Sequence, residues 1–286
     1  MRWTRKGRSR NLEDRRFQTS RRRGAGVGLG GMLLLLILSF FLGPEVMQIL
    51  GPALSAPAPP ATDRSAPAGR ASPEEEELVD FMSFILDDIQ ATWAQVLPSA
   101  SGTAYQETQL VLFRDATPTA CGYGQSATGP FYCPGDRKMY LDLSFFDQLN
   151  RRFGAPGDFA QAYVIAHEIG HHIQTITGIE QQVRAAQARS PESRNQIQVR
   201  MELQADCLAG VWGNSTARRD LLQRGDIEEG LRAAASIGDD AIQEQTTGRV
   251  RPESFTHGSS EQRVEWLRRG LETGDVGACD TFAGGI

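Results

Sequence analysis

Three of the chain's four histidines lie within one eight-residue stretch, HEIGHHIQ, which runs from His167 to Gln174. Residues four apart on a helix share one face, so the imidazoles of His167 and His171 can reach the same metal ion. Glu168 follows the first of them directly and is placed to contact a metal-bound water rather than the metal itself. This H-E-x-x-H pattern predicts a zinc site in which Glu168 acts as general base in a hydrolytic reaction.

A catalytic zinc ion needs a third protein ligand and keeps one position for water. His172 faces away from the other two histidines, so we expect it to be solvated or to support the site without binding the metal. No further histidine follows at the spacing of a third ligand. The third ligand is therefore predicted to be a carboxylate, with His257 as the alternative.

The sequence ELQAD supplies two carboxylates one helical turn apart, Glu202 and Asp206. Their neighbours are apolar, and acids on an apolar helix need a partner, which disfavours the alternative of an exposed acidic face. Glu202 is predicted to bind the zinc. Asp206 is predicted to accept a hydrogen bond from the free ring nitrogen of a ligating histidine, which fixes that ring's tautomer. Spacing cannot order the two acids, so the exchanged roles stay open.

The elements that must position these residues are expected to be mostly helices, accompanied by a small β-sheet. Capping signals at Ser72-Pro73 and at Ser259-Ser260 predict two of the helix N-termini. Helices are expected at 72–97, from Asp158 to Gly178, from Ser190-Pro191 through MELQADCLAGVWG, from Asp226, and from Ser259 to about Gly274; strands are expected at 109–117 and 138–143. The predicted fold class is therefore α+β, with the folded domain at residues 72–286.

Three segments of different composition precede this domain. Residues 1–23 are strongly basic, residues 24–43 (GAGVGLGGMLLLLILSFFLG) carry no charge, and residues 44–71 are rich in Pro and Ala. At about 1.5 Å per residue the uncharged stretch can cross a hydrocarbon core of about 30 Å. It is predicted to be a transmembrane helix followed by a linker, with a cleaved signal peptide as the alternative. The basic flank predicts a cytoplasmic N-terminus, with residues 72–286 on the other side of the membrane.

The four cysteines permit two disulfide bonds in an exported domain. Cys121 and Cys133 bracket a Gly-rich loop, so a local bridge between them is expected, and Cys207 would then pair with Cys279. Spacing favours this pairing over the two other connectivities without deciding it. The chain has no C-x-x-C pair, which disfavours the cysteines as zinc ligands.

Together these segments resemble the bacterial neutral zinc metallopeptidases, a membrane-anchored family within the gluzincin group. The resemblance runs nearly end to end and rests on MRWTRKGRSRNLEDRR, TACGYGQSATGPFYCPGDRKMYLDLSFF, HEIGHHIQ, ELQADCLAGVW, FTHGSSEQRVEWLRRG and GACDTF. It implies a zincin-like domain that cleaves a peptide or protein substrate, with His167, His171 and Glu202 as ligands of Zn²⁺. It also implies Glu168 as base, Asp206 as support, and a single-pass protein of the bacterial inner membrane whose catalytic domain is periplasmic or extracellular.

Two further features bear on catalysis. His257, just before the last expected helix, is the candidate donor to the oxyanion of the reaction, with Tyr140 and Tyr123 as weaker candidates. The alternative for His257 is a loop histidine with only a local hydrogen bond. Residues 138–146 alternate as an edge strand does and are expected either to add an extended peptide by β-augmentation or to be a plain structural strand.

Two other functions compete with a peptidase. A membrane-tethered scaffold could keep zinc only for stability, but such a site is normally closed by four protein ligands, and only three good ligands and a base are visible. A cytosolic nucleic-acid-binding protein could use the basic segment, but the neighbouring uncharged stretch explains that segment as a topology signal. We therefore expect no nucleic-acid partner, and the sequence predicts no oligomeric state.

Overall fold

The computed structural model describes residues 1–18 and 71–283. Met1–Arg16 and Ala71–Ile286 form one compact unit. The predicted membrane span at 24–43 lies outside the described residues, as does nearly all of the predicted linker at 44–71.

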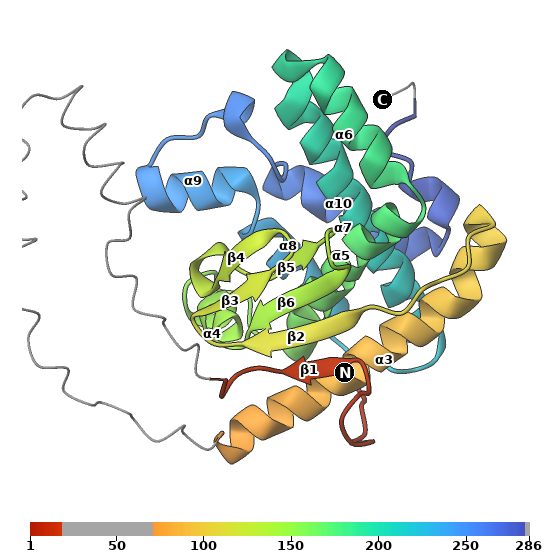
Figure 1. The fold of residues 1–286 in the computed structure, drawn as a ribbon, viewed down its shortest axis with the longest axis vertical. Coiled ribbons are helices and arrows are strands. Elements are labelled where there is room, and N and C mark those ends of the chain that lie inside the picture. The colour runs from red at the N-terminus through yellow and green to blue at the C-terminus, as the bar shows by residue number, and fades with distance from the viewer. Residues whose placement is uncertain (19–70, 284–286) are drawn as a thin grey trace, which may run out of the picture. The chain divides into compact units, whose positions relative to one another are not determined.

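A mixed four-stranded sheet with the strand order β1-β2-β6-β5 forms one part of this unit (Figure 1). The first three strands in this order are parallel, and β5 is antiparallel to β6 at the edge. Strands β3 and β4 form a separate antiparallel pair. The bounds are β1 Leu12–Asp14, β2 Gln109–Phe113, β3 Ala116–Thr119, β4 Gly122–Gln125, β5 Phe131–Cys133 and β6 Lys138–Asp142. The expected strand at 138–143 is present, but it is interior and does not form the sheet edge.

The two faces of the four-stranded sheet bury different side chains, because successive residues of a strand point to opposite faces. One face joins the main hydrophobic core with Leu110, Leu112, Met139 and Leu141. The opposite face forms a small second core from Val111, Phe113, Cys133 and Tyr140, against which Phe131 packs. Since both faces are covered by protein, an extended ligand could pair with the sheet only at an edge, and among the described residues the two edge strands are β1 and β5.

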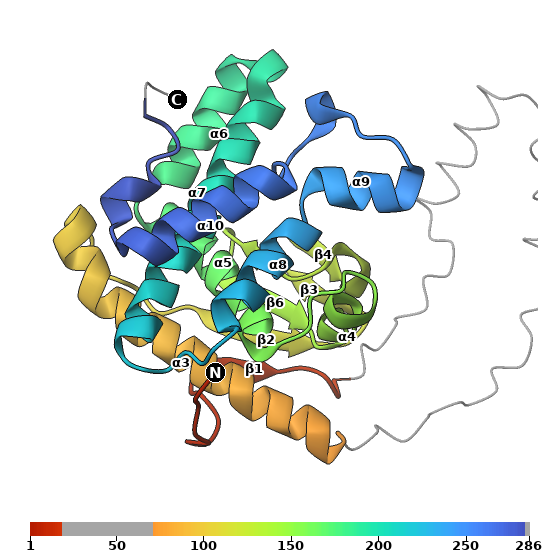
Figure 2. The same cartoon turned by 180° about the vertical axis from the view of Figure 1, so that it is seen from behind.

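Helices make up most of the unit, as the sequence predicts (Figure 2). Their bounds are α3 Pro73–Ser101, α4 Ser144–Arg151, α5 Asp158–Ile176, α6 Ile179–Arg189, α7 Arg194–Arg218, α8 Asp226–Ser236, α9 Asp239–Thr247 and α10 Ser260–Thr273. The expected caps are present at Ser72 for α3 and at Ser259 for α10, where Gln262 completes a capping box. The helix expected at 72–97 continues through Pro98 and ends at Ser101, with the left-handed Gly102 as its C-cap.

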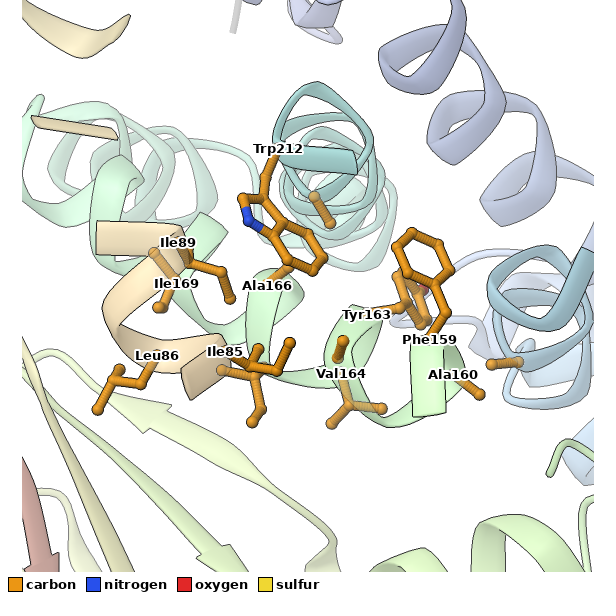
Figure 3. Packing of buried hydrophobic residues seen from close by; sticks show 14 of the residues in the cluster. Ile85, Leu86, Ile89, Phe159, Ala160, Tyr163, Val164, Ala166, Ile169 and Trp212 are labelled. Carbon is orange, nitrogen blue, oxygen red and sulfur yellow. The ribbon is translucent and has the colours of Figure 1, made fainter. Parts of the chain in front are cut away.

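Helix α5 lies in the centre of the main core, between α3 and α7 (Figure 3). Ile85 and Ile89 of α3 approach it from one side, and Trp212 of α7 stacks on its Phe159 with ring centroids 5.8 Å apart. Polar side chains on such a helix need internal partners or must line a cavity. The three histidines of HEIGHHIQ are therefore constrained by packing before any metal is considered.

Both expected disulfide bonds are present. Cys121–Cys133 joins the turn before β4 to the edge strand β5, and Cys207–Cys279 joins α7 to the C-terminal segment. All four cysteines are used in this way, so none can ligate a metal. The pairing favoured by sequence spacing is confirmed.

The predicted cellular location is wrong. Strand β1, from the segment predicted to be cytoplasmic, pairs with β2 of the domain predicted to lie on the other side of the membrane. Arg16 is buried and forms ion pairs with Glu75 and Glu76 of α3. Residues 1–16 and the domain are parts of one folded unit, so they cannot lie on opposite sides of a membrane as a single-pass arrangement requires. Among the described residues, moreover, no helix is both long and apolar enough to cross a membrane.

Candidate metal centre

Helices α5 and α7 bring three metal-binding side chains to one point. The Nε2 atoms of His167 and His171 lie 3.2 and 3.3 Å from the same carboxylate oxygen, Oε2 of Glu202. Two ligands of a tetrahedral zinc ion with bonds of about 2.0–2.1 Å are about 3.3 Å apart, so the observed spacing suits zinc. The three side chains are the set that the sequence proposed as ligands, and they form a group able to hold a metal ion.

Gly170 explains how α7 comes close enough for Glu202 to reach the histidines. A Cβ atom at this position would lie 2.9 Å from the Cα of Ala205 and 3.0 Å from its carbonyl oxygen. A side chain here would push the two helices apart. The glycine within H-E-x-x-H therefore serves a close helix–helix contact.

Asp206 holds His167 from behind the site. Its Oδ1 lies 2.8 Å from Nδ1 of His167, so Nδ1–H donates to the carboxylate and Nε2 is the atom that can bind a metal once it has lost its proton. Burial by itself would lower the pKa of His167, but the charge and hydrogen bond of Asp206, with Glu202, raise it to about 9. Burial opposes ionisation of Asp206, yet Arg263 and His167 lower its pKa to about 2. Asp206 is thus a fixed anion. It contacts Nδ1 of His167, whereas Glu202 contacts Nε2, so Asp206 can orient the ring and Glu202 can share a metal ion with it.

Gln174 plays the matching part for His171. Its side-chain oxygen lies 2.9 Å from Nδ1 of His171, while its nitrogen donates to the carbonyl of Met201 and to Gln204. These two acceptors determine which way the amide points, so its oxygen must face the imidazole. The Nε2 atom of His171 is again left toward Glu202. One histidine is thus supported by an anion and the other by a neutral amide.

Glu168 is a buried acid without a fixed partner. It is 7% exposed, and within the described part of the chain it makes no hydrogen bond or ion pair. It lines a pocket of about 480 Å³ together with the three proposed metal ligands. A carboxylate that lines a pocket without a protein partner is free to act on a bound molecule, which is expected at a functional site.

His257 lines the same pocket as Glu168. Its Nδ1 lies 3.2 Å from Oδ1 of Asp239, whose other oxygen accepts backbone N–H groups from Thr256, His257 and Gly258. The hydrogen bond to Asp239 raises the pKa of His257, so its protonated form is favoured. With Nδ1 engaged, Nε2 remains available to a ligand in the pocket.

The tyrosines expected as weaker donors lie elsewhere. Tyr140 is buried under Phe131 and donates to Asp136, and Tyr123 is 60% exposed on β4. The pocket is lined instead by Tyr132 and Tyr163. Neither is singled out by the sequence as a functional residue.

His172 is neither a metal ligand nor solvated. It is buried; its Nε2–H donates to the carbonyl of Gln106, and its Nδ1 accepts from the hydroxyl of Tyr132. Burial lowers its pKa, which keeps the ring neutral. The residue ties α5 to β5 at the back of the pocket and so helps to position the edge strand.

Sequence reasoning missed several supporting residues: Tyr163, Gln174, Asp239 and Arg263. Gln174 was recognisable in principle, since it lies three residues after His171 on the same helix. Arg263 follows the capping box of α10, and Asp239 opens a helix that the sequence did not predict. Both act from segments distant in the sequence, and no local pattern indicates such contacts.

The fold and the site define a mostly helical α+β domain built around an H-E-x-x-H helix, with a carboxylate brought to it by a neighbouring helix. The chain belongs to the family described as "Putative neutral zinc metallopeptidase", which matches residues 1–282. This confirms the family resemblance seen in its motifs.

Relatives of the chain occur in distant bacteria. It is 45% identical over 292 residues to "Uncharacterized protein YpfJ" of Escherichia coli strain K12, covering 100% of both chains. It is 42% identical over 208 residues to "Uncharacterized protein Mb2605" of Mycobacterium bovis, covering 69% of this chain and 68% of that relative. No solved structure gives a significant match.

Proposed function

We propose that this protein is a zinc-dependent peptidase that hydrolyses peptide bonds in its pocket, with Glu168 as general base. The observation that carries the proposal is the convergence of two imidazole nitrogens and one carboxylate oxygen beside an unpaired buried carboxylate. Three protein ligands leave room for water at a tetrahedral ion, as catalytic zinc sites require. Zinc, when bound, supplies a Lewis acid that polarises the scissile carbonyl and acidifies a coordinated water.

The chain's own groups then divide the proton transfers. Glu168 accepts a proton from the attacking water and returns it to the nitrogen of the leaving amine. His257 donates a hydrogen bond from Nε2 to the oxygen that gains negative charge as the carbonyl carbon becomes tetrahedral. Asp239 keeps the His257 ring oriented for this through its bond to Nδ1.

The edge strand β5 supplies a place for the substrate backbone. Phe131 and Tyr132 of β5 line the pocket, and among the described strands β5 pairs only with β6. An extended peptide can therefore add to its free edge by β-augmentation. The pocket wall also carries the apolar side chains of Phe145, Phe153, Val164 and Ile242. These side chains favour an apolar substrate residue next to the cleaved bond.

A structural zinc site in a non-catalytic scaffold is the second candidate. It predicts a closed ligand shell and no need for an unpaired acid. The pocket beside the cluster and the unpaired carboxylate of Glu168 favour catalysis instead.

The Glu168→Gln substitution tests the proposal. It should leave zinc bound at one ion per chain, because Glu168 is not a ligand, and should slow cleavage of an unfolded casein substrate by about 100- to 10,000-fold. Metal analysis and a fluorescent casein assay measure the two effects. The matched control is Glu272→Gln, an exposed glutamate of α10, which should change neither. Zinc-loaded wild-type protein that cleaves no peptide in a diverse library would support the scaffold instead.

A further inference from the structure

Arg263 is a buried cation that the proposed reaction does not use. Its guanidinium donates to both oxygens of Asp206, with Nε to Oδ2 and Nη2 to Oδ1 each at 2.9 Å. Nη2 also lies 3.1 Å from the hydroxyl oxygen of Tyr163, and Nη1 donates to the carbonyl of Ile237. Arg263 is 3% exposed, and it lines the pocket. This two-pronged geometry is the strongest form of a carboxylate–cation contact.

The hydrogen bonds to Asp206 converge on the oxygen that holds His167. Oδ1 accepts from Nδ1 of His167 at 2.8 Å, from the Tyr163 hydroxyl at 2.5 Å and from Arg263. The carboxylate has no freedom to rotate while these donors and the Nε contact are in place. Its direction, and with it the direction of the His167 ring, is set by Arg263 and Tyr163 together.

The approach of α10 to α7 is what brings Arg263 to this carboxylate. A Cβ on Gly270 would lie 2.0 Å from the carbonyl oxygen of Cys207, and one on Gly210 would lie 2.3 Å from the carbonyl oxygen of Leu267. The two helices therefore touch backbone to backbone beyond the site. The capping box at Ser259 starts α10 just before Arg263, so helix start and helix contact together place the guanidinium.

The negative charges around the site explain why a cation is needed next to Asp206. The site contains three buried acids. Glu168 and Glu202 line the pocket, and Asp206 lies behind His167. A carboxylate behind a ligating histidine fixes the orientation of that ring, so the carboxylate must itself be held in place. Arg263 balances the charge of Asp206 while leaving its hydrogen bond to His167 intact. An ordinary structural ion pair would not need to share its oxygen with a metal ligand.

We propose that Arg263 is a positioning residue of the metal centre, which holds Asp206 as the oriented acceptor of His167 and makes α10 part of the zinc site. The proposal rests on the proposed zinc site, and it deepens that function without adding a second one. Loss of Arg263 should therefore weaken zinc binding and change the coordination geometry, even in protein that remains folded.

Zinc affinity of the full chain tests this, measured by competition with a chromophoric chelator in Arg263→Met, Arg263→Lys and wild type. Arg263→Met should bind zinc about 10–100-fold more weakly, the usual effect of losing a supporting partner, and Arg263→Lys should recover part of the loss. The visible spectrum of the cobalt-substituted proteins should shift in the same order. The matched control is Arg16→Met, which removes another buried, ion-paired arginine remote from the pocket and should lower stability without changing zinc affinity.

If Arg263→Met does not fold, Arg263→Lys and Tyr163→Phe carry the test, because each keeps most of the side-chain volume. Tyr163→Phe should weaken zinc binding several-fold. Unchanged zinc affinity and an unchanged cobalt spectrum in the folded variants would overturn the role of Arg263 while leaving the proposed function intact. Wild-type protein that binds no zinc would overturn the proposed function itself, and the role of Arg263 with it.

Discussion

Three buried carboxylates of one site have different partners. Glu202 faces two imidazole Nε2 atoms, Asp206 faces an imidazole Nδ1, a tyrosine and an arginine, and Glu168 has no hydrogen-bond or ion-pair partner within the described residues. The same chemical group is thus suited to binding a metal, orienting a ligand or carrying a proton. Partners therefore indicate roles more directly than residue type does.

The raised pKa of His167 predicts that zinc binding depends on pH. In the metal-free protein this pKa is about 9, and the proton must leave before Nε2 can bind zinc. Zinc affinity should therefore rise by about tenfold per pH unit for each proton displaced between pH 7 and 9, and then level off. Chelator competition at several pH values, or calorimetry in two buffers of different ionisation enthalpy, measures this.

The same shift has a consequence for stability without metal. A folded-state pKa above the ordinary 6.5 stabilises the fold fully below that value, and the contribution is lost as pH rises through about 9. The metal-free protein should therefore lose stability between pH 6.5 and 9, whereas the zinc-loaded protein should not show this loss. Zinc affinity that is independent of pH would contradict the hydrogen-bonding pattern described for His167.

At the scale of elements, glycines decide how closely the helices approach. Gly170 lets α5 touch α7, and Gly210 and Gly270 let α7 touch α10. Each contact carries a functional group into place: Glu202 in the first case and Arg263 in the second. The spacing of the helices is therefore part of the chemistry of the site.

The substitution Gly170→Ala should separate α5 from α7. The added methyl group would lie 2.9 Å from a backbone atom of Ala205, which cannot move without its helix. We expect a loss of about 1–3 kcal/mol in unfolding free energy and weaker zinc binding. Thermal unfolding and chelator competition measure the two effects. The double variant Gly170→Ala/Ala205→Gly should recover part of both, and recovery of neither would argue against this contact as the cause.

The two disulfide bonds should contribute to different properties. Cys207–Cys279 closes a separation of 72 residues, and its loss should cost about 4 kcal/mol of unfolding free energy by the chain-entropy relation. Cys121–Cys133 closes 12 residues, which corresponds to about 3 kcal/mol, but it also anchors the edge strand β5. Replacing Cys121 and Cys133 by serines should therefore lower Tm and also raise KM for a peptide substrate, whereas replacing Cys207 and Cys279 should lower Tm with KM unchanged. The reverse pattern would contradict β5 as the substrate strand.

At the scale of the whole molecule, the beginning of the chain is built into the domain that carries the site. Strand β1 lies at one edge of the sheet and β5 at the other, so residues 12–14 form the edge opposite the pocket. Arg16 then joins this segment to α3 through Glu75 and Glu76. A basic N-terminal segment that looks like a topology signal is in this protein a structural part of the fold.

Two arginines of this segment should respond differently to substitution. Arg16→Met should lower the unfolding free energy by about 2–3 kcal/mol, less than a fully buried ion pair would, because its acidic partners are partly exposed. Arg10→Met should have almost no effect, because that side chain is 79% exposed. Denaturant unfolding of both variants measures this. Equal effects would imply that the basic charge of the segment matters and that its packing does not.

Short-range patterns were sufficient for the features that depend on helix geometry. The rise and turn of a helix put His167 and His171 on one face whatever surrounds them, and they put Glu202 one turn from Asp206. The capping box of α10 and the start of α3 were likewise predictable, because a cap involves only neighbouring residues. The family resemblance carried by these motifs was correct for the same reason.

The remaining features depended on contacts between residues far apart in the chain. Only packing decided that Glu202 and not Asp206 faces the Nε2 atoms, that Arg263 from α10 fixes Asp206, and that β5 rather than β6 lies at the sheet edge. The same holds for β1, whose three residues have no strand signal and are ordered by pairing with β2. Such choices are made by the close approach of helices and by strand pairing. Both are collective properties of the folded chain, and no local spacing encodes them.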